Sequence, residues 1–524
     1  MNERDLVVGV DIGTSSAKAV ITNDRGEVIA EHSSEYGVLA PRPLWAEQWP
    51  EVWLEGLVEA VRGALERAGG EARRVRAMSI SSLYGGSGIP VDADMKPLRP
   101  CLIWMDRRAL EETDWVKREV PLDELVRVTG NGVDSYYGFT KILWLKRNEP
   151  EVWERTHYLL PPNAYAVYRL TGEIAVDHSS AANIGGVYDM AERSWSASMA
   201  ERLGIPPRLF PERLVASADV VGSLHAEGAA LTGLPQGMPI CAGGVDAPMA
   251  TLSASVFEAG QHVAMMGTST CWGFIHQQVP REAGLVSMPY VLHPETNTYT
   301  FGGSATAGAV VKWFRDELGG VERAVEDWTR GAANLNAYAQ FDQRAAGLPP
   351  GSDGLLLLPY LMGERSPIWD VHARGTLIGL TLHHSRAHLY RACLEGVAFA
   401  LRHNIEAGLA AGYPLDDELR LVGGVAKSKL WTQIIADVTG YPVLAADSGG
   451  EAAYGDAMLA ALGVGLADES GIASWVESAA LYSRFEPNPE ANATYSRIYP
   501  HYVGAYEDLR ERFAAMAATA AGAI

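Results

Sequence analysis

A short polar turn near the N-terminus carries the first residues whose types and spacing suit chemistry. Asp11 ends an apolar run, Gly13 permits a tight turn, and Thr14, Ser15 and Ser16 follow at once. Such a turn exposes backbone N–H groups and hydroxyls, which bind phosphate oxygens. The carboxylate of Asp11 stands where it can hold hydrated Mg²⁺, which needs only one or two carboxylates beside phosphate. An ordinary hairpin with polar turn residues is the alternative.

A second turn of the same kind lies about half a chain away. Residues 262–275 repeat the pattern of residues 8–21: an apolar strand, a Gly-Thr-Ser turn and another apolar strand. In the second copy Met265 stands where the first has Asp11, so Gly267–Thr270 offers neutral donors. We therefore expect the first turn to serve the metal ion and the terminal phosphate, and the second to contact phosphate through neutral groups. A purely structural turn is the alternative.

Asp246 follows two glycines at the end of an apolar strand and opens a predicted helix. An Asp at this place is a common helix N-cap, worth about 1 kcal/mol. The other role is a general base, because a carboxylate within hydrogen-bond reach of a hydroxyl aligns that hydroxyl and accepts its proton. Phosphoryl transfer needs mainly such positioning and charge stabilisation. Taken alone, the residue favours the cap.

A third glycine loop, Gly423–Ser428, follows a predicted strand and precedes a predicted helix. Its small residues allow a flat adenine ring or a phosphate to approach the backbone. The loop has neither a GxGxxG nor a Walker pattern, and a plain strand–helix turn is the alternative.

Three histidines, His383, His384 and His388, gather around the start of one predicted helix. We see no metal-binding spacing with a supporting carboxylate. Structural roles are therefore expected for these side chains.

The elements that must position these turns alternate between sheet and helix. Residues 6–13, 17–22 and 27–36 predict a meander of consecutive hairpins, followed by a helix over 50–68 with a Gly-Gly stop. Hairpins inside an alternation of strands and helices indicate α/β layers with mixed sheets. Further helices are predicted over 138–155, 161–171, 304–317, 321–340, 384–411, 429–439, 450–463 and 490–518.

Size and composition bound the answer. The chain has 524 residues, which exceeds the roughly 250–300 residues of a single core, so two large domains are expected. A net charge of -21 repels nucleic acids and anionic membranes. Four well-separated cysteines without a CxxC pair fit a reducing cytoplasm, and we find neither a signal-peptide core nor an apolar run of spanning length. A homodimer is left open.

Together the motifs resemble the FGGY family of carbohydrate kinases, in its xylulokinase-like branch. The stretches VVGVDIGTSSAKAVITNDRGEVIAE, YYGFTKILWLKRNEPEVW and VGGVAKSKLWTQIIADVTGYPV are similar to parts of that family, and GERSPIWDVHARGTLIGLTLHHSRAHLYRACLEGVAFALR is the most specific. The resemblance implies an α/β fold of two actin/hexokinase-like (ribonuclease H-like) lobes, with mixed sheets flanked by helices and a central cleft. We place the lobes at 1–250 and 251–485, with a C-terminal helical segment at 486–524.

The resemblance also implies roles for individual residues. It makes Asp246 the catalytic base and assigns Asp11 to Mg²⁺. The residues that it assigns to ATP are Thr14, Ser15, Gly267, Thr268, Gly308, Lys312, Gly423, Gly424 and Ser428. The implied reaction is transfer of the γ-phosphate of ATP to a hydroxyl of a small sugar.

The choice of sugar rests on two segments that depart from common patterns of the family. Tyr84 stands where members acting on ketopentoses often carry Gln-Met-His, and Trp104, Asp106 and Arg107 stand where glycerol-type members carry an Arg-Glu pair. We expect these residues and Asp246 to bind a ketopentose of the xylulose or ribulose kind. A polyol or aldonate, such as glycerol, erythritol or gluconate, is one alternative, and a catalytically silent sugar-binding regulator is another.

Two adjacent arginines, Arg107 and Arg108, bear on that choice. They either meet an acidic sugar or pair with carboxylates of the protein. Pairing within the protein is the interpretation that we favour.

Overall fold

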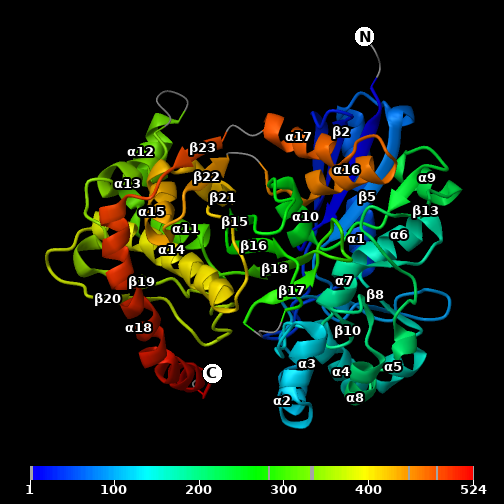
Figure 1. Cartoon of the computed structure of the whole chain (residues 1–524), viewed down its shortest axis with the longest axis horizontal. Helices are drawn as coiled ribbons and strands as arrows, with labels where there is room; N and C mark the ends of the chain where they lie inside the picture. The colour runs from blue at the N-terminus through cyan, green and yellow to red at the C-terminus, as the bar shows by residue number, and fades with distance from the viewer. Residues whose placement is uncertain (1–3, 281–283, 331–334, 447–448, 480–481, 523–524) are drawn as a thin grey trace. The chain divides into compact units, whose positions relative to one another are not determined.

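The structure is a computed structural model that describes residues 4–280, 284–330, 335–446, 449–479 and 482–522. Its chain forms two compact units, whose elements are labelled in Figure 1. The first consists of the described residues up to Ala259 with Ile275–Thr300 and Gly449–Ala479, and the second of Gly260–Phe274, Phe301–Ser448 and Ala480–Ile524. We predicted lobes at 1–250 and 251–485, whereas residues 449–479 belong to the first unit. The C-terminal segment that we predicted as separate, 486–524, belongs to the second unit.

The first unit is built on a six-stranded mixed sheet of order β13-β14-β5-β1-β2-β3. Strands β1, β2 and β3 are antiparallel neighbours, as the predicted meander requires, and β5 and β14 continue the sheet in parallel on the other side of β1. The strands are β1 (Leu6–Ile12), β2 (Ser16–Asn23), β3 (Val28–Glu35), β5 (Val75–Ser82), β13 (Val220–Ser223) and β14 (Pro239–Cys241).

Alternation along β1 sends its side chains to two different layers. Val8, Val10 and Ile12 are completely buried in the core that α1 (Pro50–Arg67) covers. Gly9 faces the opposite layer, where a Cβ atom would come within 1.9 Å of the carbonyl oxygen of Ala453. Glycine thus lets α16 (Ala452–Gly463) lie directly on the sheet (Figure 1). Alternation along β1 places Asp11 on the same face as Gly9.

The second sheet has seven strands in the order β17-β18-β16-β15-β21-β22-β23. β15 forms an antiparallel hairpin with β16 and runs parallel to β21, which runs parallel to β22. This repeats the arrangement of β2, β1, β5 and β14, so the predicted fold of two related mixed sheets is confirmed. The strands are β15 (His262–Met266), β16 (Thr270–His276), β17 (Val286–Pro289), β18 (Thr298–Gly302), β21 (Leu419–Val422), β22 (Val443–Ala446) and β23 (Tyr482–Phe485).

Ten short strands form two-stranded pairs outside the main sheets. The pairs are β4 (Glu47–Gln48) with β7 (Cys101–Leu102), β6 (Ile89–Val91) with β8 (Tyr158–Leu160), β9 (Val176–Asp177) with β12 (Leu214–Val215), β10 (Tyr188–Asp189) with β11 (Ser194–Trp195), and β19 (Leu356–Leu358) with β20 (Thr376–Ile378).

The helices follow the predictions with a few breaks. The helix expected over 138–155 is broken before Pro150, because proline supplies no N–H for a continuous helix. The helix expected over 321–340 is two helices, and residues 331–334 lie outside the described residues. Besides α1 and α16 the α-helices are α2 (Leu110–Glu119), α3 (Leu122–Thr129), α4 (Gly138–Asn148), α5 (Pro150–Arg155), α6 (Pro162–Thr171), α7 (His178–Asn183), α8 (Ala197–Leu203), α9 (Ala226–Thr232), α10 (Asp246–Ser253), α11 (Gly308–Leu318), α12 (Gly320–Thr329), α13 (Ala337–Ala345), α14 (Arg386–Ala410), α15 (Lys429–Thr439), α17 (Glu469–Ala479) and α18 (Pro489–Gly522).

Within the described part of the chain, no helix combines the length and the apolar character needed to cross a membrane.

Candidate active site

Asp246 stands at the start of α10, directly after the glycine turn that ends β14. Gly243 has φ +67°, and a Cβ atom there would lie 1.8 Å from the carbonyl oxygen of Ile80, so only glycine fits this turn. The N-cap position belongs to Val245, and among the described residues the one hydrogen bond to the Asp246 carboxylate comes from the adjacent N–H of Ala247, at 2.7 Å. The capping role that the sequence favoured for Asp246 is therefore wrong, and its carboxylate is left for another task.

Asp11 lies at the end of β1 in the same unit. The hydroxyl of Ser81 donates to its Oδ1 over 3.4 Å, a long hydrogen bond. Burial, and next to it the charge of Asp246, raise the pKa of Asp11 to about 7. Burial raises the pKa of Asp246 to about 6. The charge of Asp246 disfavours ionisation of Asp11, so the two carboxylates form an oxygen-rich place whose repulsion a cation would relieve.

Asp456 is a third acid in this region that sequence reasoning missed. It lies on α16, is completely buried and accepts a hydrogen bond from the hydroxyl of Ser79 at 2.8 Å. Burial raises the pKa of its carboxyl well above the usual range. The signal was present in the sequence, because Asp456 interrupts an otherwise apolar helix.

The first turn brings a predicted phosphate residue to a predicted sugar residue. The indole N–H of Trp104 donates to the hydroxyl of Thr14 at 3.0 Å, and the Gln48 amide donates to the Thr14 carbonyl oxygen at 2.9 Å. Ser15 is exposed beside them. The hairpin, Trp104 and Asp11 thus belong to one polar surface of the first unit.

Tyr84 borders a small cavity of about 10 Å³ together with Ser82 and Val245, the residue before Asp246. Its hydroxyl oxygen accepts a hydrogen bond from the N–H of Gly138. The Tyr84 side chain is buried and forms part of the wall of this cavity.

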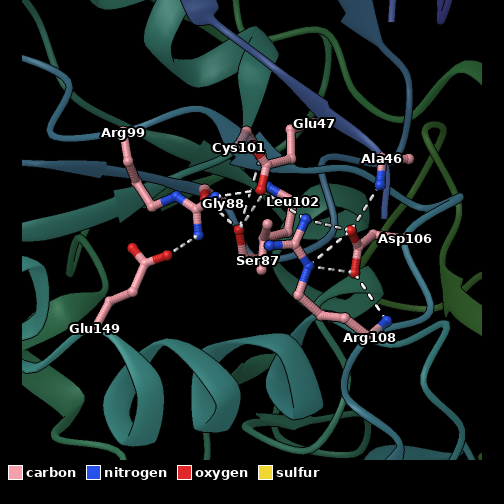
Figure 2. A network of polar contacts seen from close by, with 10 residues as sticks. All are labelled: Ala46, Glu47, Ser87, Gly88, Arg99, Cys101, Leu102, Asp106, Arg108 and Glu149. Atoms are coloured by element: carbon pink, nitrogen blue, oxygen red, sulfur yellow. Dashed lines mark hydrogen bonds and ion pairs between the residues drawn. The ribbon is translucent and has the colours of Figure 1, made fainter. Parts of the chain in front are cut away.

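Both arginines pair with carboxylates of the protein, as expected. Arg107 forms an ion pair with Asp134. Figure 2 shows Arg108 directed at Asp106, whose oxygens accept from its Nε at 2.9 and 3.0 Å and from its Nη2 at 2.7 Å. The N–H of Ala46 donates to Asp106 as well, at 2.7 Å.

Asp106 is completely buried, and the Arg108 side chain is 1% exposed. The structure therefore places Asp106 within a protein network, whereas the sequence had it facing a sugar. Glu47 extends this network, because its Oε1 accepts from Arg108 and from Arg99, each at 2.6 Å (Figure 2).

A cavity of about 450 Å³ in the second unit has the size of a small-molecule site. Four of the predicted ATP residues line it: Gly267, Gly308, Gly424 and Ser428. Val425 and Lys427, from the predicted third glycine loop, also line it. The lining residues that the sequence did not indicate are Val311, Asn336, Tyr338, Ala339, Asp342, Tyr390 and Trp431.

Close backbone approaches require glycine at two positions beside this cavity. A Cβ atom on Gly308 would lie 2.6 Å from the carbonyl oxygen of Gly267. The same oxygen accepts a hydrogen bond from the Gly308 N–H at 2.9 Å. Gly423 has φ +98°, and its Cβ atom would lie 2.6 Å from the carbonyl oxygen of Met266. The second hairpin turn, the start of α11 and the loop after β21 are therefore packed backbone to backbone.

Two predicted ATP residues have other partners. The Thr268 carbonyl oxygen accepts from the N–H groups of Ala307 and Ala309, at 2.8 and 3.1 Å. Lys312 is exposed on α11 and pairs with Asp316 at 2.6 Å. Thr268 thus stays beside the cavity wall, whereas Lys312 is engaged at the surface.

One wall of the cavity is fixed by a partly buried hydrogen-bonded group. The Ser428 hydroxyl donates to Asp342 at 2.7 Å, and the hydroxyl of Tyr390 donates to the other oxygen of Asp342 at 2.8 Å. Ser428 also caps α15 by accepting from the N–H of Trp431. Burial raises the pKa of Asp342. Asp342 therefore holds two elements of the cavity together.

The resemblance assigns Ser428 to ATP, and on that expectation Ser428→Ala should raise the KM for ATP by roughly fivefold, because a lost hydrogen bond at a partly buried position costs about 1 kcal/mol. The KM for sugar should stay within twofold. Initial-rate kinetics with each substrate varied in turn measure both. Asp327→Asn, an exposed carboxylate on α12 of the same unit, is the control. An unchanged KM for ATP in Ser428→Ala would separate this cavity from the nucleotide.

The histidine cluster does have a carboxylate, which corrects the expectation from sequence. One ligand-type atom each of Asp353, His383 and His388 lie within 4.8 Å of one another. However, Nδ1 of His388 accepts the N–H of Ser385 at 3.1 Å, so the neutral ring carries its proton on Nε2 and donates to Asp353 at 3.1 Å. That tautomer offers no lone pair toward a metal ion. The group caps α14, which is the structural role expected.

Two related mixed sheets, a glycine turn carrying an acid and a glycine-lined cavity define a two-unit α/β phosphotransferase. Residues 6–253 match the N-terminal domain of the FGGY family of carbohydrate kinases, and residues 262–464 match its C-terminal domain. The chain belongs to the FGGY family of carbohydrate kinases and is a carbohydrate kinase.

Relatives span nearly the whole chain. It is 31% identical to the xylulose kinase of Bacillus subtilis over 94% of this chain and 97% of that protein. It is 27% identical to the gluconokinase of Bacillus licheniformis over 98% of this chain and 97% of that protein. The crystal structure of xylulose kinase from Rhodospirillum rubrum superposes with a TM-score of 0.85 at 29% identity, covering 97% of this chain and 99% of that one.

Proposed function

We propose that this carbohydrate kinase transfers the γ-phosphoryl group of ATP to a hydroxyl of a ketopentose of the xylulose or ribulose kind, with Asp246 as general base. The observation that carries the proposal is the state of the Asp246 carboxylate. It stands on a rigid glycine turn, does not cap α10, and has one backbone hydrogen bond. Such a carboxylate can align a sugar hydroxyl and accept its proton.

The pairing of the arginines supports a neutral sugar over an aldonate. A gluconate-like substrate carries a carboxylate, which calls for a free cationic partner. Arg107 and Arg108 are instead taken by Asp134 and Asp106. The xylulose kinase relative points the same way, whereas the gluconokinase relative keeps the aldonate as the second candidate.

Magnesium fits the acidic group of the first unit. The donor set is oxygen, from Asp11 with Asp246 near enough to influence its ionisation. An ion held there would neutralise charge on a phosphate group. Thr14 and Ser15 supply hydroxyls and backbone groups next to Asp11, while Gly267, Thr268, Gly308, Gly423, Gly424 and Ser428 are proposed to hold ATP in the second unit.

A panel of acceptors tests the choice of sugar. Xylulose, ribulose, erythritol, glycerol and gluconate are compared by kcat/KM in a coupled assay of ADP release. We expect a ketopentose to lead by at least tenfold. A lead for gluconate would show that the ion pairs of Arg107 and Arg108 do not exclude an acidic sugar.

The pH dependence of the reaction follows from the pKa of Asp246. The base must be ionised, and burial raises its pKa from 3.8 to about 6. We therefore expect kcat/KM for the sugar to be half-maximal near pH 6 and to fall about tenfold per pH unit below it. Rates are measured from pH 4.5 to 8 at saturating ATP and excess coupling enzyme. A plateau that continues down to pH 4.5 would contradict the assignment of the base.

A further inference from the structure

The peptide group immediately before Val245 is held from two sides. Its carbonyl oxygen, on Gly244, accepts from the N–H of Ser82 on β5 at 2.9 Å. Its N–H, on Val245, donates to the hydroxyl of Ser179 at 3.1 Å. The next residue along the chain is Asp246. The plane of this peptide therefore sets the direction in which α10 starts and in which the Asp246 side chain leaves the backbone.

Ser179 is itself fixed by a buried carboxylate, which a buried amide holds in turn. Its hydroxyl donates to Oδ1 of Asp177, the residue that caps α7 by accepting from the N–H of Ser180 at 2.9 Å. Oδ2 of Asp177 accepts from the Asn163 amide at 2.9 Å. The same amide donates to the carbonyl oxygen of Ala242 at 3.2 Å, on the strand side of the glycine turn.

The side chains of this hydrogen-bonded group are almost completely buried. Asn163, Asp177 and Ser179 are each 1% exposed. Gly244 shows how closely they approach the turn, because a Cβ atom there would lie 2.7 Å from the Ser179 hydroxyl oxygen. A hydrogen-bonded group of this kind has one low-energy arrangement, since any rotation would leave buried polar atoms without partners.

We propose that Asn163, Asp177 and Ser179 form a positioning clamp that fixes the Asp246 carboxylate for phosphoryl transfer. The proposal rests on the proposed function, in which Asp246 is the base. Ser179 acts through Val245 and needs no contact with substrate. A displacement of about 1 Å in a reacting group can cost about a hundredfold in rate. Loss of the Ser179 hydroxyl should therefore lower kcat while leaving substrate binding in place.

Ser179→Ala is expected to lower kcat about tenfold, with both KM values within twofold and the shape of the pH profile unchanged. Ser253→Ala is the matched control. Its hydroxyl is also buried, near the far end of α10, and donates to the carbonyl oxygen of Ala250 at 3.0 Å, away from the glycine turn and from the clamp. It should keep kcat within twofold. Ser179→Cys, nearly equal in volume but a weak acceptor, covers the case in which the alanine variant does not fold and should also lose kcat.

A double-mutant cycle with Asp246→Asn separates the clamp from the base. If Ser179 acts through Asp246, Ser179→Ala should cost nothing further in the Asp246→Asn background, measured with radiolabelled ATP. Equal losses in both backgrounds, or wild-type kcat in folded Ser179→Ala and Ser179→Cys, would overturn the clamp and leave Asp246 as base. Near-normal activity of Asp246→Asn alone would overturn the proposed base and the clamp with it.

Discussion

Replacing Asp246 with asparagine should lower kcat for sugar phosphorylation by about 10²–10⁴-fold, the usual contribution of a general base. Asparagine keeps the size of the side chain and can still accept the hydrogen bond from the N–H of Ala247, so the fold should persist. Its amide cannot take the proton of the attacking hydroxyl. ATP binding should be unchanged within twofold, as measured by titration calorimetry beside steady-state kinetics.

The same variant should be more stable than the wild type at neutral pH. The pKa of Asp246 is about 6 in the folded protein and 3.8 for the ordinary side chain. The protonated carboxyl group therefore stabilises the folded state below pH 4, and this contribution is lost as the pH rises through 6. Asp246→Asn should thus raise the free energy of unfolding at pH 8 by an amount on the order of 1 kcal/mol. Its melting temperature should be higher than that of the wild type at pH 8 and unchanged at pH 4. Asp94→Asn, which alters an exposed carboxylate, should change neither rate nor stability. A catalytically impaired variant that is also destabilised at pH 8 would mean that Asp246 is structural.

The two hairpins show what local patterns are able to predict. Alternating apolar residues around Gly13 and around Gly267 predict two strand–turn–strand units, and the structure confirms both with the same neighbours in their sheets. Each hairpin is specified by residues close together in sequence, so its pattern survives without tertiary information. The arrangement of the two lobes along the chain was inferred from the resemblance to the FGGY family.

The parts that sequence reasoning missed depend on contacts between distant segments. Asp456 reaches the face of β1 only because residues 449–479 return to the first unit. Asp342, on a helix that carries no motif, accepts hydrogen bonds from Ser428 and from Tyr390, which come from distant segments of the chain. Local periodicity specifies which side of a helix is apolar, but not which distant element covers it.

The segment around Asp106 shows a different limit. A conspicuous acid between Trp104 and two arginines indicates a binding site as readily as a buried network, because both need charged side chains. Burial separates the two: Asp106 is inaccessible and accepts from Arg108 and the backbone of Ala46. We therefore expect Asp106 to support the loop that carries Trp104, whose indole reaches Thr14.

Replacing Arg108 with alanine should destabilise the first unit by about 3–5 kcal/mol, the cost of removing one partner of a buried ion pair. The change leaves Asp106 inside the protein with its charge uncompensated and takes one cation from Glu47. It also empties the space over Trp45, whose ring centroid lies 3.5 Å from the guanidinium carbon. Lysine is a poor substitute, because it lacks the planar fork that contacts both carboxylates and lies on the indole.

Urea unfolding followed by tryptophan fluorescence measures this loss, since Trp45 and Trp144 both lie under the Arg108 guanidinium. Arg118→Ala, which breaks an exposed ion pair with Glu119, should cost less than about 1 kcal/mol and serves as the control. If Arg108→Ala were as stable as that control, the network would add nothing to the folded state. Arg108 would then be free to serve an acidic substrate, and the argument for a neutral sugar would lose its basis.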